Sequence, residues 1–232
     1  SSYKPSSINN KAKLFKAFTL SMFLDQYKFD WLKSSASAPS GGRDIFTQLN
    51  YTPTKKIDMY VRFRHRTKYQ NSTVDNYYDY LSPYVQQNVR YNFSAQISPE
   101  IKIKSRIEYT HIIKSDAPNE DGAAFAQDVI YKKLNSPFSF TVRYAVFDSK
   151  SYDSRLYIYE NDVLYGYSVP ALYYKGQRAY ALVNWDITRN FEIWVRVAQT
   201  ILDNKTVMQE GSLNQINGNK RTEVKFQMRL KF

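Results

Sequence analysis

The final twelve residues of the chain alternate between an apolar and a polar side chain at every step. Successive side chains of a β-strand point to opposite faces, so this pattern predicts a strand with one apolar and one charged face. Twelve residues at about 3.3 Å each are long enough to cross a bilayer core when the strand is tilted. The apolar register consists of Thr222, Val224, Phe226, Met228, Leu230 and Phe232.

The same period of two recurs along most of the chain. Each repeat places apolar residues at every second position and polar or basic residues between them, which predicts further strands with one apolar face. The clear repeats cover 57–64, 88–97, 101–108, 138–146 and 191–198, and weaker ones cover 18–24 and 45–51.

The connections between these segments fall into two kinds. Short turns rich in Pro, Asn, Asp and Ser are expected at 53–55, 98–100, 135–136, 161–162 and 187–190. Longer or more polar loops are expected at 33–43, 68–85, 114–123, 148–151 and 203–220, with a compact one at 174–177. Counted back from the C-terminus, the short turns all fall at one end and the loops at the other. This arrangement predicts twelve antiparallel strands, with both termini on the short-turn side.

The segment 152–173 is the hardest to assign, because Pro170 and a run of tyrosines obscure its register. Two strands are predicted there, since an even count keeps every short turn on the same side. A single long strand would break this regularity.

Two kinds of antiparallel sheet fit the alternation: a soluble sheet with its apolar face inward, and a membrane barrel with its apolar face outward. Three features favour the barrel. Loop lengths differ between the two ends, and the chain stops on a phenylalanine in the apolar register. Aromatic residues also flank the short turns, as an interfacial girdle requires; they are Tyr51, Tyr131, Phe138, Trp185, Phe191 and Phe232. We therefore predict an all-β, antiparallel transmembrane β-barrel of about twelve strands, with short periplasmic turns and longer outer loops, as one domain over residues 1–232.

Composition supports this prediction and narrows the chemistry. Aromatic residues make up 16% of the chain, which favours strands, and no run of 18 apolar residues predicts a membrane-spanning helix. The chain has no cysteine, which excludes disulfides, thiolate metal sites and a cysteine nucleophile. No signal peptide is visible at Ser1, so the sequence is expected to be a mature chain, a fragment or a chain that is not exported.

Two stretches resemble known proteins. The terminal TEVKFQMRLKF is similar to the signal by which barrel-assembly machinery recognises bacterial barrels. This resemblance implies an assembly role for Phe226, Met228, Leu230 and Phe232. The stretch SYDSRLYIYENDVLYGYSVPALYYKG, with FEIWVRVAQT and NKRTEVKFQMRLKF, resembles the C-terminal β-barrel region of uncharacterised Bacteroidota outer-membrane proteins, from about Trp31 onward. Several of those carry N-terminal helix-hairpin-helix motifs, which bind DNA. That motif is absent from this sequence, so nucleic acid is not an expected partner of this chain alone.

The formal net charge is +12, and basic residues collect in the polar register of the strands. Facing carboxylates are fewer, namely Asp58, Glu108, Glu192 and Glu223. A basic lumen would attract anions, because a narrow pore with low-dielectric walls concentrates the field. The equal alternative is a salt-bridged interior that only keeps the wall hydrated. The residues predicted to form the basic lumen are Arg62, Arg64, Arg90, Lys102, Lys104, Arg106, Arg143, Arg196, Lys225 and Arg229; Arg221 and Lys231 share their register.

Catalysis and metal binding have little support in the sequence. His65 and His111 are expected near loop ends of different strands, without the spacing of a metal site. Ser115, Asp116 and Glu120 follow His111, but they share one predicted loop, whereas catalytic triads draw on separate segments. We therefore expect no catalytic residues, no metal and no cofactor.

The sequence favours a passive channel or a binding barrel for anionic solutes in a bacterial outer membrane. The alternative is a structural or scaffold subunit of a larger envelope complex, linked to DNA or protein transport. The expected partners are the lipid bilayer, the barrel-assembly machinery and other envelope proteins.

Overall fold

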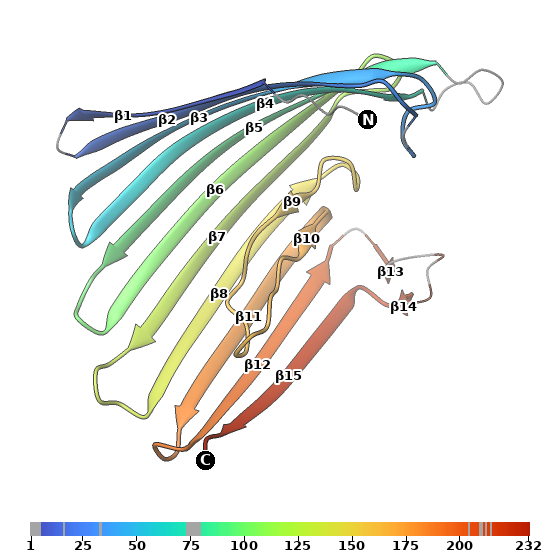
Figure 1. Cartoon of the computed structure of the whole chain (residues 1–232). Coiled ribbons are helices and arrows are strands. Elements are labelled where there is room, and N and C mark those ends of the chain that lie inside the picture. Colours follow the sequence, from blue (N-terminus) through green and yellow to red (C-terminus); the bar gives the residue numbers. More distant parts are fainter. Residues whose placement is uncertain are drawn as a thin grey trace.

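The computed structural model describes residues 6–15, 17–32, 34–72, 80–203, 205–208, 211, 213 and 215–232. Over this part of the chain the fold is all-β, and the long strands form one eleven-stranded antiparallel sheet (Figure 1). Among these residues, no helix is both long and apolar enough to cross a membrane.

Ten consecutive connections of the sheet join neighbouring strands, so the chain runs up and down in sequence order. The eleven strands are β1 (Ser6–Phe15), β2 (Phe18–Phe29), β3 (Ser40–Thr54), β4 (Ile57–Asn71), β5 (Leu81–Gln96), β6 (Ile101–Lys114), β7 (Glu120–Lys132), β8 (Phe138–Ser149), β11 (Tyr174–Asp186), β12 (Phe191–Leu202) and β15 (Lys220–Leu230). Four two-residue strands form two small hairpins in the loops: β9 (Leu156–Tyr157) with β10 (Ala171–Leu172), and β13 (Val207–Met208) with β14 (Ile216–Asn217).

The predicted difference between the two ends of the sheet is confirmed. Short turns join β3 to β4, β5 to β6, β7 to β8 and β11 to β12 at one end, whereas the longer connections lie at the other (Figure 1). The fold class is therefore the predicted one, an antiparallel barrel wall with short turns and longer loops.

The prediction of twelve strands is wrong in two places. Residues 152–173 do not add two strands to the sheet, because β8 pairs directly with β11 from Ser149–Tyr174 to Phe138–Trp185. The short turn expected at 161–162 lies inside this loop, and residues 174–177 begin β11 rather than form a connection. The strand β1 was not predicted. It starts at the loop end, where Ser6 pairs with Gln26, and not at the short-turn side expected for the first strand.

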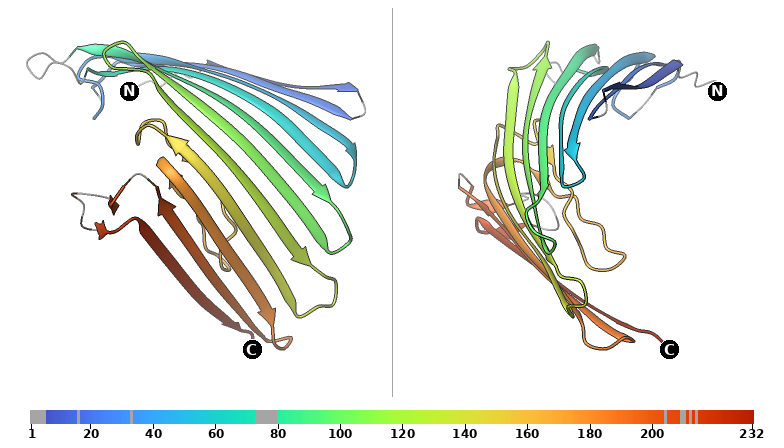
Figure 2. Two further views of the ribbon diagram at one scale, coloured as in Figure 1. Left: turned by 180° about the vertical axis from the view of Figure 1, so that it is seen from behind. Right: turned by 90° about the vertical axis from the view of Figure 1, so that its left-hand side faces the viewer.

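The sheet is strongly curved, with one convex and one concave face (Figure 2). The apolar register of the long strands from β2 to β15 points to the convex face, where many of these large side chains remain exposed. Among the polar residues on this face, Ser105 and Gln127 bond to each other: the Ser105 hydroxyl lies 2.5 Å from Oε1 of Gln127. Exposed apolar side chains over the whole length of a sheet are what lipid contact requires.

Aromatic rings gather on the convex face near the short turns, as predicted. Three cross-strand pairs stack there: Phe18 with Tyr51, Tyr131 with Phe140, and Phe138 with Trp185, with ring centroids 4.4, 5.0 and 5.3 Å apart. Aromatic rings are favoured at the level of lipid headgroups. These pairs therefore mark the periplasmic boundary of the apolar surface.

The loop at 150–173 folds back over the concave face instead of extending outward (Figure 2). Its apolar residues Leu156, Ile158 and Leu172 pack on small or apolar side chains of the wall, including Ala124, Ala126, Ala145, Phe147 and Leu202. A Cβ on Gly122 would lie 2.2 Å from the Ser154 carbonyl oxygen, so glycine is required where this loop approaches β7. We call residues 150–173 the inward loop.

Candidate functional site

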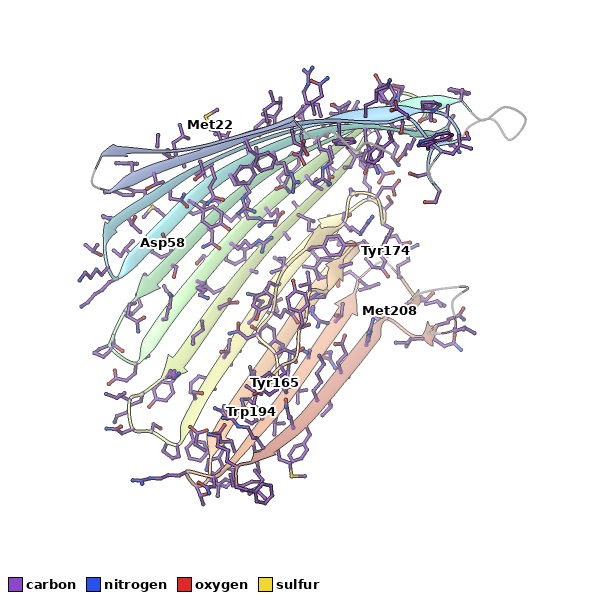
Figure 3. All side chains as sticks on the ribbon, in the orientation of Figure 1. Met22, Asp58, Tyr165, Tyr174, Trp194 and Met208 are labelled. Carbon is purple, nitrogen blue, oxygen red and sulfur yellow. The ribbon has the colours of Figure 1, made fainter. Side chains whose placement is uncertain are left out.

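The ten basic residues predicted to face the lumen all lie in the concave register. Cross-strand partners show this directly: Arg62 pairs with Arg90, which pairs with Glu108, and Asp128 pairs with both Lys104 and Arg143. On the last strands Arg196 pairs with Lys225, and Arg229 with Glu192. Figure 3 shows how densely side chains cover both faces of the wall. That this face lines a lumen stays a prediction.

On the β3–β6 part of the wall, single carboxylates each serve two guanidinium groups. Glu108 accepts from Arg90 at 2.7 and 3.0 Å and from Nε of Arg106 at 3.0 Å. Asp44 accepts from Arg64 at 2.6 Å and from Arg66 at 3.2 Å. Because each carboxylate carries one charge, two arginines around it leave one net positive charge. This part of the wall therefore keeps a basic surplus.

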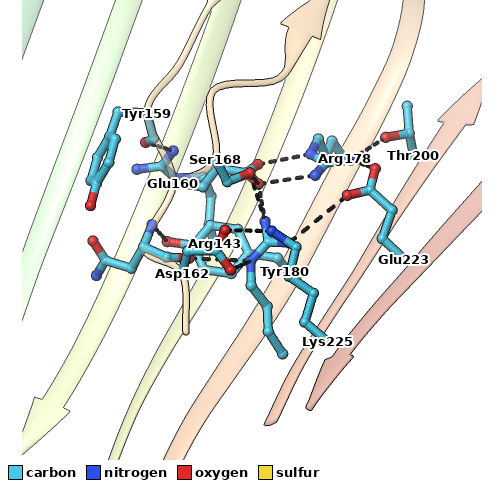
Figure 4. Close-up of polar contacts among 12 residues, drawn as sticks. Arg143, Tyr159, Glu160, Asp162, Ser168, Arg178, Tyr180, Thr200, Glu223 and Lys225 are labelled. Atoms are coloured by element: carbon cyan, nitrogen blue, oxygen red, sulfur yellow. Dashed lines mark hydrogen bonds and ion pairs between the residues drawn. The ribbon is translucent and has the colours of Figure 1, made fainter. Parts of the chain in front are cut away.

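On the β8–β15 part, the inward loop supplies the missing acidic groups (Figure 4). Glu160 accepts from Nε and Nη2 of Arg178, at 2.8 and 3.0 Å, and forms an ion pair with Arg196. The side chains of Glu160, Arg178 and Arg196 are 2%, 3% and 0% exposed. Buried charges of this kind are stable only when they are paired and hydrogen-bonded.

Asp162 extends the same network. Its carboxylate forms an ion pair with Lys225 and lies 3.8 Å from Nε of Arg196. Beside it, the Tyr180 hydroxyl accepts from the backbone N–H of Asn161 at 3.2 Å. Arg143 bonds to Asp128 of the wall. It also donates to the Tyr159 carbonyl of the loop (Figure 4). Five basic or phenolic side chains of the wall thus hold residues 159–162 in place.

Three of the predicted basic residues have no carboxylate within ion-pair distance in the described part of the chain: Arg62, Lys102 and Lys104. Arg62 donates from Nε to the Gln48 side chain at 2.8 Å. These residues are on β4 and β6, outside the area that the inward loop neutralises. The free positive charge is therefore concentrated on one side of the loop.

A cavity of about 320 Å³ lies between this basic wall and the start of the inward loop. Among the described residues, Glu108 and Asp153 are the carboxylates of its lining. The uncharged polar side chains of the lining include Gln86, Asn88, Thr110, Tyr84 and Tyr157, all able to hydrogen-bond. The basic side chains of the lining are Arg62, Arg64, Arg66, Lys68, Arg90 and Arg155. We call this space the basic cavity.

Arg155 closes the loop side of the basic cavity. Its Nε donates to the Tyr157 hydroxyl at 2.6 Å, and its guanidinium lies 3.9 Å from the ring centroid of Tyr152. This hydrogen bond from Arg155 lowers the pKa of Tyr157 from its ordinary value. The guanidinium is thus held by two aromatic rings rather than by an acid, and it adds its charge to the cavity.

The candidates for catalysis do not come together. His111 lies in the convex register, where its Nδ1 is 2.6 Å from Asp121. Glu120 lies in the concave register and binds Lys114 at 2.8 Å. His111 and Glu120 are therefore on opposite faces of the sheet. His65 also lies in the convex register, next to Thr67 and Gln87. No group of three metal-ligating side chains occurs within the described residues.

The residues of the predicted assembly signal lie on the last strand and beyond it. Phe226, Met228 and Leu230 point to the convex face of β15, and Phe232 follows the strand and is fully exposed. Their recognition by assembly machinery stays a prediction.

Sequence patterns did not reveal Glu160 and Asp162 as partners of the wall. One signal was present: four inward positions of β7 and β8 near the loop end are small, namely Gly122, Ala124, Ala126 and Ala145. A hydrated lumen gives no reason for such residues, whereas a loop packed against them does.

Comparison with known proteins finds similar architectures among solved structures. No protein-family model matches the chain, and no curated protein does either. Among solved structures, the copper transporter OprC is similar over 97% of this chain, with a TM-score of 0.57 and 9% identity. The ferric-catecholate import receptor Fiu from E. coli is similar in its closed form over 97% of this chain, with a TM-score of 0.53 and 9% identity. The chain spans 41% of OprC and 45% of Fiu.

These likenesses define the class of the fold. The chain forms a wall of an outer-membrane β-barrel, in which the apolar convex face contacts lipid. This fold and this surface place the protein in the bacterial outer membrane, with the bilayer as the environment of its convex face.

Proposed function

We propose that this protein is part of an outer-membrane channel or binding barrel for anionic solutes, and not an enzyme. The observation that carries the proposal is the basic cavity, in which six cationic side chains face two carboxylates. An anion that entered this space would meet the guanidinium groups of Arg62 and Arg155, which bind the Gln48 side chain and the Tyr157 hydroxyl and no carboxylate among the described residues. Guanidinium groups bind carboxylates and phosphates through two parallel hydrogen bonds, so solutes with these groups fit best.

The inward loop determines how wide an anion path along the wall can be. Its ion pairs with Arg178, Arg196 and Lys225 keep it on the concave face, where it narrows the space beside the wall. We infer a constricted anion path, or a binding site, on the β4–β6 side of the loop. The wide opening of a general porin does not fit this arrangement.

The scaffold alternative also has one observation in its favour. The inward loop neutralises the β8–β15 part of the wall and fills the concave face there, as a barrel with a permanently blocked lumen would require. In that case the basic cavity is only a hydrated space beside a structural loop. The resemblance to the barrel region of Bacteroidota outer-membrane proteins fits either function.

A measurement of ion selectivity distinguishes the anion channel from the scaffold alternative. The protein, extracted from outer membranes in its inserted form, is placed in a planar bilayer with a salt gradient. We expect an anion-selective reversal potential. Arg62→Glu with Lys104→Glu is expected to shift it toward cations, because neither side chain has a carboxylate partner among the described residues. Lys55→Glu, in the turn between β3 and β4, is the matched control and should leave it unchanged.

A cation-selective pore would contradict the proposal. Absence of conductance, together with no phosphate binding that depends on Arg62 and Arg155 of the basic cavity, would favour the scaffold alternative.

A further inference from the structure

The strands β1 and β15 are the two edges of the eleven-stranded sheet. In the described part of the chain, each pairs with one neighbour only, β1 with β2 and β15 with β12. Figures 1 and 2 show that the curved sheet leaves these edges far apart on an open side.

The two edge strands run in the same direction. Ser6 of β1 pairs with Gln26 near the loop end of β2, and Phe15 pairs with Phe18 at the short-turn end. Lys220 of β15 pairs with Ile201 near the loop end of β12, and Leu230 pairs with Phe191 at the turn end. Both strands therefore run from the loops to the short turns.

This direction restricts how the barrel can close. Direct pairing of β1 with β15 would create a parallel seam in an otherwise antiparallel wall. A second copy inserted in the same orientation would also bring β15 beside β1 in parallel, at two seams. An antiparallel closure requires an odd number of additional strands between the two edges.

The edges cannot stay unpaired in the membrane. Lipid offers no hydrogen-bond partner for backbone groups, so strands span a bilayer only in closed barrels. The convex side chains of β15 also lack cover on one side: Phe226 is 59% exposed, compared with 38% for its cross-strand partner Val195. Val224 is 68% exposed, compared with 43% for its partner Val197.

We propose that an odd number of further transmembrane strands of the same polypeptide bridge β15 and β1 and complete the barrel. The up-and-down order favours one continuous chain, because every neighbouring pair in this sheet is also consecutive along the chain. The chain also spans less than half of each transporter that it resembles. A wall of 22 strands, the size of outer-membrane transporters, would need about eleven more, an odd number. This inference is independent of the solute.

Photo-crosslinking from the β15 edge tests the proposal on the natural gene product in outer membranes. A benzophenone amino acid replaces Val224, Phe226 or Met228 in turn, all exposed on the convex face. The same residue at Val195 is the control, because this residue lies between Val183 of β11 and Phe226 of β15. Mass spectrometry then identifies the crosslinked residues.

We expect crosslinks to a strand of the same polypeptide outside residues 1–232. The crosslinked position should move backward along that strand as the probe moves from 224 to 228, because the neighbour is antiparallel. Ala12 of β1 should likewise crosslink to a strand outside residues 1–232, which is the same strand if one bridges the two edges and a different strand if three or more do. Crosslinks from β15 to residues 6–15 of the same or another copy, advancing in parallel, would overturn the proposal. Crosslinks to a different protein, or none where the Val195 control succeeds, would overturn it as well.

Discussion

Glu160 and Arg196 form an ion pair in which neither side chain is more than 2% exposed. Glu160 belongs to the inward loop, and Arg196 points from β12 to the concave face. The loop is therefore fastened to the wall by charges that water does not reach, with Arg178 and Asp162 in the same network.

Removing one partner of this network should loosen the loop. Glu160→Gln leaves Arg178 and Arg196 buried without their main carboxylate, which costs about 3–5 kcal/mol in typical buried pairs. We expect lower stability in urea titrations in detergent, and faster tryptic cleavage after Arg155 in intact membranes. Glu223→Gln is the control, because Glu223 is 25% exposed and lies 3.4 Å from Arg178. Equal effects of both substitutions would mean that Glu160 does not hold the loop.

The contact of Gly122 with the inward loop should not tolerate a side chain. In Gly122→Ala, the new Cβ would lie 2.2 Å from the Ser154 carbonyl oxygen, so the loop or the strand has to move. Overpacking of this kind costs about 1–3 kcal/mol. Trypsin should cleave the loop faster than in the wild type. Ala123→Val adds more volume one residue away on the convex face, and should leave the cleavage rate unchanged.

The convex face should reject charge. Val142→Arg or Phe226→Arg places a guanidinium against lipid and should cost about 2–4 kcal/mol near the bilayer midplane. Gln227→Arg, adjacent to Phe226 but in the concave register, should have little effect. Folding titrations into lipid vesicles measure the difference. Similar losses at Phe226 and Gln227 would argue against the assignment of the two faces.

Phe232 should matter for assembly rather than for the stability of the sheet. It lies beyond β15 and is fully exposed, so its removal takes away little packing. If it belongs to the assembly signal, its deletion should leave unfolded chain in the periplasm while synthesis continues. Normal insertion of the shortened chain would show that Phe232 has no part in the signal.

Much of the wall could be predicted from the sequence, because most of its strands have an apolar face toward lipid and a mainly polar face on the concave side. Such a strand has to alternate strictly, as 138–146 and 222–230 do. The same argument placed Arg62, Arg143 and Arg196 on one face. Strand number was predicted less well, since it depended on how residues 152–173 were assigned.

The inward loop could not be predicted, because its structure depends on the wall that receives it. Leu156 and Ile158 alternate with Tyr157 and Tyr159, which imitates a membrane strand. In the folded chain these apolar residues pack on Ala124 and Ala145, and Glu160 meets arginines of two other strands. Period-two patterning cannot distinguish contact with lipid from contact with a neighbouring loop. The edge strand β1 was missed for a different reason, because its polar sequence SSINNKAKLF does not alternate.

Accessibility along β4 tests the orientation of the wall, on which the whole account rests. The chain has no cysteine, so single cysteines at positions 59 to 64 can each carry a fluorescent bimane label. We predict quenching by nitroxide lipids at 59, 61 and 63, and quenching by aqueous iodide at 60, 62 and 64. The opposite alternation, or equal quenching by both agents at all six positions, would contradict an outer-membrane wall with a lipid-facing convex side and a basic, water-filled concave side.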